Sequence, residues 1–149
     1  MKSYGRITVT AIKKVGVLMV NPSCNMPLIV TYDPDNDSYT PDWRNNNLVI
    51  SPIVTFDGEV VTNNRNCKVT FTRMTGNSGE VELGAGEVVN NNQLTVSVVE
   101  PLSSSPSDSL TYCIHTEYTD VKTGVTLTNL SYLNFSLNRQ ASVMKYAHI

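Results

Sequence analysis

Hydrophobic and polar residues alternate along most of the chain from Asn66 to Leu137, in short segments separated by Gly, Asn, Ser and Pro. An alternation with a period of two is typical of strands that bury one face. No segment between them has a helical period, and this spacing of short strands favours an all-β fold of the β-sandwich type. The predicted strands are Cys67–Met74, Glu80–Leu83, Leu94–Val99, Leu110–Tyr118 and Val125–Leu137.

The last two predicted strands carry the clearest apolar faces. In the second of them, Asn129 and Ser131 fall on the otherwise apolar face, so we expect a β-bulge at this point. The positions that share a face are Leu110, Tyr112, Ile114, Thr116 and Tyr118 in the first strand and Leu133, Phe135 and Leu137 in the second.

The N-terminal part of the chain begins with the same alternation, which places Ile7, Val9 and Ala11 on one face. From Val15 to Val20 the chain is uniformly apolar. This run predicts either a strand buried within the same chain, which is the favoured interpretation, or a strand that pairs with a partner subunit. A further short strand is expected at Leu28–Tyr32.

These patterns divide the chain into three parts. We interpret residues 1–44 as an N-terminal arm or a set of extra strands, and residues 45–138 as the sandwich proper. Residues 139–149 form a C-terminal tail, for which a frayed end is favoured over an ordered docking peptide.

Asparagine is abundant and clustered, and it marks the expected turns. The clusters lie at residues 45–47, 63–64 and 90–92. Asparagine tolerates left-handed backbone angles, so each cluster predicts a turn. Asp57-Gly58 is a hairpin signal of the same kind, and Pro52 predicts a strand edge or a bulge because proline cannot donate to a ladder.

The chain carries a formal net charge of −2, and only 16% of its residues are charged. This balance gives no basic field for nucleic acid, so no nucleic-acid partner is expected. The first residues lack the apolar core of a signal peptide, and no apolar run approaches the roughly 18 residues that span a membrane. We therefore expect synthesis in a cytosol and no membrane partner.

An aspartate-rich loop offers the best metal candidate. Asp33, Asp35 and Asp37 place carboxylates at alternate positions, as a calcium loop requires. The sixth position of such a loop is Ser38 instead of Gly, and the twelfth is Arg44 instead of Glu. A solvated turn whose carboxylates cap local amides is favoured, and no metal or other cofactor is expected.

Nucleophilic catalysis requires a Ser or Cys beside a positioned base, and the chain has two histidines. Cys113 and His115 share one face of a predicted strand, but chance produces such a pair easily. The three cysteines lack the spacing of a zinc site. An enzyme is therefore not expected.

Two sets of residues are candidates for intermolecular contact. Tyr39 and Trp43, near the aspartate-rich loop, could bind a surface such as a glycan, although Trp43 packing the arm onto the sandwich is favoured. The candidates for subunit contact are Val15, Val17, Leu18, Met19, Val20, Val143, Met144, Tyr146 and Ile149.

The segment from about Asn47 to Leu137 resembles an immunoglobulin-like domain. The resemblance is carried by Cys67–Thr72 as a central strand, by Leu94–Val96, and by Asp108–Cys113, which looks like the tyrosine-corner strand. Tyr112 directly precedes Cys113 here, whereas in the antibody pattern the tyrosine lies two residues before the second cysteine. This departure puts a Cys67–Cys113 bridge between the sheets in doubt.

Several short motifs also look like those of immunoglobulin-like virion proteins of tailed bacteriophages, especially phages of gut bacteria. They are Thr31–Pro34, Tyr39–Trp43, Leu48–Pro52 and Tyr118–Asp120. The resemblance implies a non-enzymatic structural protein in the virion, such as a capsid decoration, a head-fibre anchor or a neck or tail component.

The expected partners are other virion proteins, namely major capsid or fibre proteins, with the chain as a homo-oligomer or bound to a lattice. An N-terminal arm can add a strand to a neighbour by β-augmentation. The alternative is a carbohydrate- or cell-surface-binding immunoglobulin-like module, with a host-surface glycan as its ligand.

Overall fold

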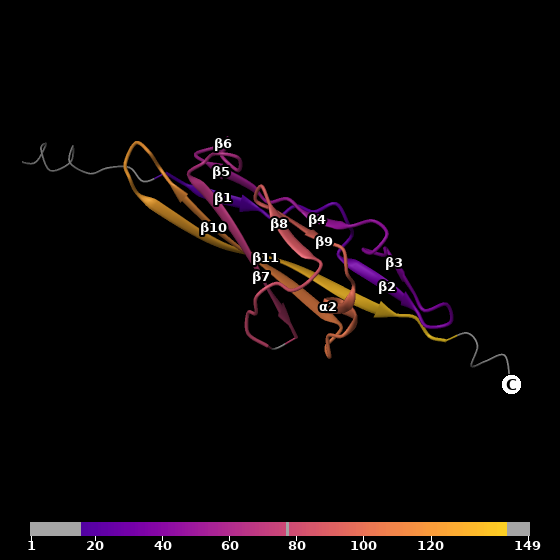
Figure 1. Cartoon of the computed structure of the whole chain (residues 1–149). Helices are drawn as coiled ribbons and strands as arrows, with labels where there is room; N and C mark the ends of the chain where they lie inside the picture. The colour runs from indigo at the N-terminus through magenta and orange to yellow at the C-terminus, as the bar shows by residue number, and fades with distance from the viewer. Residues whose placement is uncertain (1–15, 77, 143–149) are drawn as a thin grey trace, which may run out of the picture.

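The computed structural model describes residues 16–76 and 78–142, and these residues form an all-β fold (Figure 1). The largest sheet has five strands in the order β3-β2-β11-β10-β7. All neighbours in it are antiparallel except β2 and β11, which are parallel. The β10–β11 hairpin runs along most of the length of the molecule. The bounds are β2 Ile29–Asp33, β3 Ser38–Thr40, β7 Cys67–Thr75, β10 Ser109–Thr119 and β11 Thr126–Arg139.

Two smaller sheets accompany the large one. The first has the order β1-β5-β6, and the second has the order β4-β9-β8. Pro52 separates β4 from β5, as expected for a residue that cannot donate to a ladder, and so one interrupted stretch of chain serves both small sheets. The bounds are β1 Leu18–Asn21, β4 Leu48–Ile50, β5 Ile53–Phe56, β6 Glu59–Val60, β8 Glu87–Asn90 and β9 Gln93–Val96, and a short helix, α2, covers Glu100–Ser103.

One hydrophobic core joins the sheets. The predicted apolar faces of β10 and β11 are buried in it, opposite Leu48 and Ile50 of β4 and Leu94 of β9. Trp43 is fully buried and meets Phe135 edge-on, with 5.2 Å between ring centroids. Burial of these large side chains is the main favourable term for folding.

The predicted strands agree with the structure in most places and fail in two. β7, β9, β10 and β11 lie where the alternation predicts them. Glu80–Leu83 is not a strand, because only an isolated bridge between Arg73 and Val81 forms there. The predicted bulge is also wrong, since the β10–β11 register runs without a slip from Ser109↔Ser136 to Thr119↔Thr126.

The polar pair that suggested the bulge is accommodated locally. Asn129 and Ser131 are half-buried, and the Ser131 hydroxyl donates to Asn129 Oδ1 at 2.5 Å. Each side chain thereby satisfies part of the other's hydrogen-bonding capacity, so the strand keeps its register.

The turn predictions based on Asn and Asp-Gly are confirmed. Asn91 and Asn92 connect β8 to β9 with φ values of 51° and 60°. Asp57 and Gly58 connect β5 to β6 with φ values of 50° and 83°. Both turns need left-handed backbone angles, which these residue types adopt most easily.

The stretch interpreted as an arm contributes strands to the same sheets as the later chain. β1 pairs with β5, and β2 pairs with the C-terminal part of β11. Its end is fixed by Trp43, which lies in the common core. Residues 16–44 are thus integrated in the fold, and residues 1–15 precede it.

Candidate assembly surface

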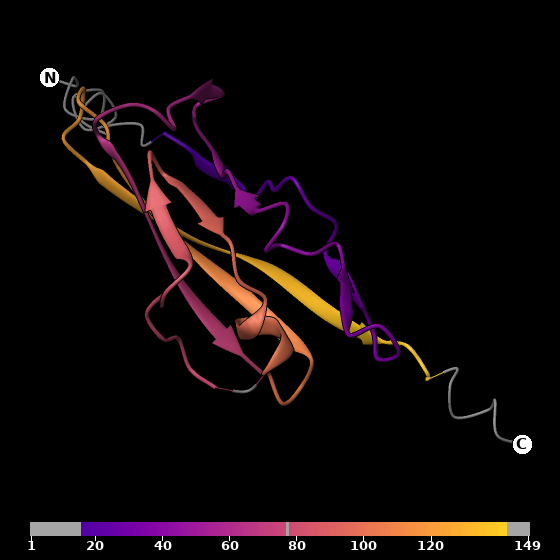
Figure 2. The same ribbon diagram turned by 45° about the vertical axis from the view of Figure 1, so that its right-hand side comes forward.

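The most distinctive surface feature is a long strand edge on β11. β10 pairs with β11 from Thr126 to Ser136, whereas β2 reaches only Ser136–Arg139 on the other side. Figure 2 shows β2 beside the C-terminal part of β11 alone. Within the part of the chain that the structure describes, the other side of β11 between Thr126 and Asn134 has no hydrogen-bonded strand partner, although β1 of a small sheet lies close to β11.

The hydrogen bonds at the end of β11 show which residues face this side. Ser136 N–H donates to Leu28 O at 2.9 Å, toward β2, and Leu137 N–H donates to Asp108 O at 2.8 Å, toward the side of β10. Successive residues of a strand direct their backbone groups to opposite sides. The even-numbered residues therefore face away from β10. We call the backbone groups of Thr126, Thr128, Leu130, Tyr132 and Asn134 the open edge.

Exposed apolar side chains accompany the open edge. Leu130 is 45% exposed and Tyr132 is 50% exposed, next to each other on the outer face of the large sheet. An unpaired row of N–H and C=O groups with apolar side chains beside it is a template for another strand. Natural proteins usually blunt such edges with Lys or Pro, and neither occurs between Thr126 and Asn134.

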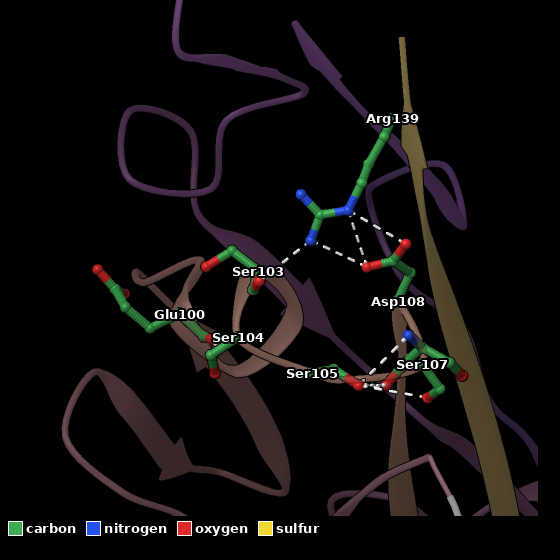
Figure 3. Close-up of polar contacts among 8 residues, drawn as sticks. Glu100, Ser103, Ser104, Ser105, Ser107, Asp108 and Arg139 are labelled. Atoms are coloured by element: carbon green, nitrogen blue, oxygen red, sulfur yellow. Dashed lines mark hydrogen bonds and ion pairs between the residues drawn. The ribbon is translucent and has the colours of Figure 1, made fainter. Parts of the chain in front are cut away.

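The C-terminal end of β11 is held by an ion pair. Arg139 Nε donates to both carboxylate oxygens of Asp108, at 3.0 and 3.1 Å, and its Nη2 lies 3.5 Å from the carbonyl oxygen of Ser103 (Figure 3). The hydrogen bond that Arg139 donates to Asp108 raises the pKa of Arg139 above its ordinary value. The guanidinium also lies over the Tyr32 ring, 5.8 Å from its centroid.

A serine cluster next to this ion pair orders the turn into β10. The Ser105 hydroxyl donates to the carbonyl oxygen of Ser109 at 2.7 Å and lies 3.4 Å from the Ser107 hydroxyl (Figure 3). The Ser104 hydroxyl donates back to the carbonyl oxygen of Glu100 in α2. These are local backbone contacts of the kind that fix loops. They order the turn that leads into β10, the strand that pairs with β11.

The subunit-contact candidates fall into three groups. Val17 and Met19 are 60% and 63% exposed, so both are accessible on β1 or just before it. Leu18 and Val20 pack against the core from the other face of the strand. The remaining candidates, Val15, Val143, Met144, Tyr146 and Ile149, lie outside the described residues.

The two aromatic surface candidates are both engaged within the chain. Trp43 is 0% exposed, so it packs in the core and is removed from the surface-binding pair. Tyr39 is half-buried, with its ring 4.9 Å from that of Tyr32 and the Arg44 guanidinium above it. Two arginine-stacked tyrosines at one end of the sheet therefore complete the packing there.

The aspartate-rich loop is a hydrogen-bonded turn. Asp33 Oδ1 accepts from the backbone N–H of Asp35 at 3.0 Å, and its Oδ2 accepts from Asn36. Asp37 accepts from the Tyr32 hydroxyl, a hydrogen bond that raises the pKa of Tyr32. Across the described ranges, no group of three or more His, Cys, Asp or Glu is arranged to hold a metal ion.

Cys113 and His115 lie on the outer face of the large sheet beneath the loop that follows β7. His115 Nε2 is 2.6 Å from Glu80 Oε1, and the Thr72 hydroxyl donates to the same carboxylate. The hydrogen bond from Thr72, together with that of His115, lowers the pKa of Glu80. Burial raises the pKa of the Cys113 thiol, which is the opposite of what a nucleophilic cysteine needs.

The cysteines are free, and the topology explains why the doubted bridge is absent. Cys67 and Cys113 both belong to the five-stranded sheet, where Cys67 is opposite Tyr118 and Cys113 is opposite Thr72. Burial also raises the pKa of Cys67. A disulfide between Cys67 and Cys113 therefore cannot join one sheet to another, because both residues lie in the same sheet.

Sequence reasoning missed the open edge. The sequence signal for it was a difference in length between two predicted strands. Val125–Leu137 is much longer than Leu28–Tyr32, so the second strand can pair with only part of the first. The missing information was the pairing, because a strand pattern does not say which neighbour covers which part of it.

No family model, curated protein or solved structure matches the chain. Among the residues that the structure describes, there is no helix with the length and apolar character needed to cross a membrane.

Proposed function

We propose that this chain is a non-enzymatic structural protein of a tailed-phage virion, built on an immunoglobulin-like sandwich and assembled through its N-terminal segment. The observation that carries the proposal is the open edge of β11, a hydrogen-bonding surface about nine residues long on an anchored strand. Binding by strand addition needs such an edge and no catalytic group.

The strand order supports the immunoglobulin-like assignment. Reading β1, β5 with β4, β9 and β8 as strands A, B, E and D gives one layer of such a domain. Reading β7, β10 and β11 as C, F and G gives the other layer, with β2 added parallel to the last strand. The motifs that resemble phage virion proteins lie within this framework.

The polar clusters support a role without catalysis. The only Cys–His pair that shares a strand face in the described residues has its histidine held by Glu80 and its thiol buried. The carbohydrate-binding alternative receives no comparable support, because Trp43 is buried and Tyr39 is stacked.

Quantitative mass spectrometry of purified particles from cells that carry the gene tests the virion role. The proposal expects the chain in washed, nuclease-treated particles at a fixed ratio to the major capsid protein. Its absence from particles, with the free protein remaining in the lysate, would contradict the proposal. A glycan array with the purified chain tests the alternative in parallel.

A further inference from the structure

The unpaired length of β11 defines what its occupant must look like. Thr126 to Asn134 spans about 30 Å at the rise of an extended strand. An occupant needs a similar length, free backbone groups and side chains that tolerate one apolar face, since Leu130 and Tyr132 border the edge. It must also lack proline at the positions that donate to β11.

The chain contains one segment of this description outside the described residues. Residues 5–12 alternate between apolar and polar side chains, contain no proline and would span about 26 Å if extended. Ile7 and Val9 provide β-branched side chains, which favour strands. Length and composition thus match the open edge.

The place where the described chain begins favours pairing between molecules. Gly16 borders the groove lined by Tyr118 and residues 120–123, next to the turn between β10 and β11. To reach its own open edge, residues 5–12 would have to fold back through Lys13, Lys14 and Val15. None of these three is a turn-forming residue, and Gly16 is not among the glycines with a positive φ.

We infer that the open edge of β11 is the acceptor for residues 5–12 of a second copy of this chain, which adds as a strand beside Thr126–Asn134. The inference rests on the proposed function and names the partner and the site of its assembly. Each copy then offers one donor segment and one acceptor edge, so strand exchange gives a symmetric pair where it is reciprocal, and a ring or an open filament where it runs head to tail.

A proline substitution tests the acceptor edge. The N–H of Leu130 faces the open edge, so Leu130→Pro removes a donor to the incoming strand without removing a hydrogen bond to β10. Val89→Pro is the matched control. Val89 is 41% exposed on β8, an edge strand of the small sheet β4-β9-β8, and its N–H faces away from β9.

Light scattering would measure the mass of each variant over a hundredfold range of concentration. We expect the full chain to reach at least twice its single-chain mass of 16.4 kDa. A chain of residues 16–149 and the full-length Leu130→Pro variant should both be monomers, whereas Val89→Pro should assemble like the parent. A labelled peptide of residues 4–13 should bind the 16–149 chain and should not bind its Leu130→Pro variant.

If Leu130→Pro does not fold, binding of the peptide to a Leu130→Lys variant tests the acceptor edge instead. The lysine places a charge beside the edge without changing the backbone, and should weaken peptide binding at least tenfold. A parent chain that stays monomeric, or a peptide that fails to bind, would overturn the inference. Assembly that needs residues 1–15 but ignores the Leu130 substitutions would also overturn it, while leaving the proposed function standing.

Discussion

The hydroxyl of Tyr112 donates a 2.6 Å hydrogen bond to Oε2 of Glu87, and this buried contact connects β10 of the large sheet to β8 of a small one. Glu87 Oε1 accepts from the backbone N–H of Gly84 at 2.8 Å and lies 3.5 Å from Arg73 Nε. A buried carboxylate is tolerated here because several donors surround it. The contact therefore connects the large sheet, which contains β11, to the small sheet β4-β9-β8.

Removing the Tyr112 hydroxyl should destabilise the fold. Tyr112→Phe leaves the buried carboxylate of Glu87 with one fewer donor, which costs about 1–3 kcal/mol of unfolding free energy. Urea unfolding of a chain of residues 16–149 measures this loss of unfolding free energy. Tyr132→Phe, at a half-exposed ring on the outer face, is the control and should stay within about 0.5 kcal/mol. Equal effects of the two substitutions would contradict the role of the buried contact.

Stability should fall at alkaline pH because of the same tyrosine. Burial, followed by the hydrogen bond to Glu87, raises the pKa of Tyr112. Below about pH 10 the hydroxyl is protonated in both folded and unfolded chains. Above it, only the unfolded chain loses the proton, so the unfolding free energy decreases as pH rises. Unfolding curves from pH 8 to 11 should show a smaller decrease for Tyr112→Phe than for the parent.

Trp43→Ala should act on stability. The side chain is fully buried against Phe135, and truncating it leaves a cavity that costs about 3–5 kcal/mol. Thermal unfolding measures the loss, and Tyr39→Ala, at a half-buried ring, should cost clearly less. Unchanged stability together with lost glycan binding would support the carbohydrate-binding alternative instead.

The cysteines should differ in their reactivity toward iodoacetamide. Cys67 and Cys113 are buried, and burial raises the pKa of both thiols. Cys24 is partly exposed. Mass spectrometry should find Cys24 modified in the folded chain, and the other two modified only when the chain unfolds. Fast modification of Cys113 in the folded protein would contradict the closed arrangement beneath Glu80.

Much of the fold could be predicted from local sequence signals. The alternation located β7, β10 and β11, and the left-handed angles of Asn91 and Asn92 followed from residue type. The strand prediction for Glu80–Leu83 was wrong because charged residues that alternate with apolar ones also suit an extended loop. In this loop the Glu80 side chain is hydrogen-bonded to Thr72 and His115.

The candidate surface was harder to predict, because it depends on pairing between distant segments. The sequence pattern suggested contacts at Val15–Val20, but Leu18 and Val20 turn toward the core. The open edge exists because β2 meets β11 only from Ser136 onward. Integration of residues 16–44 in the sheets also makes residues 1–15 the informative truncation, since a larger one would remove three strands and Trp43.

Amide hydrogen exchange, read by NMR, tests the central claim most directly. In the assembled full chain, the amides of Thr128, Leu130 and Tyr132 should exchange at least tenfold more slowly than in the 16–149 chain, because the added strand accepts their hydrogen bonds. Amides of odd-numbered β11 residues, bonded to β10 in both chains, provide the reference. Equally fast exchange of the three edge amides in both chains would contradict the account.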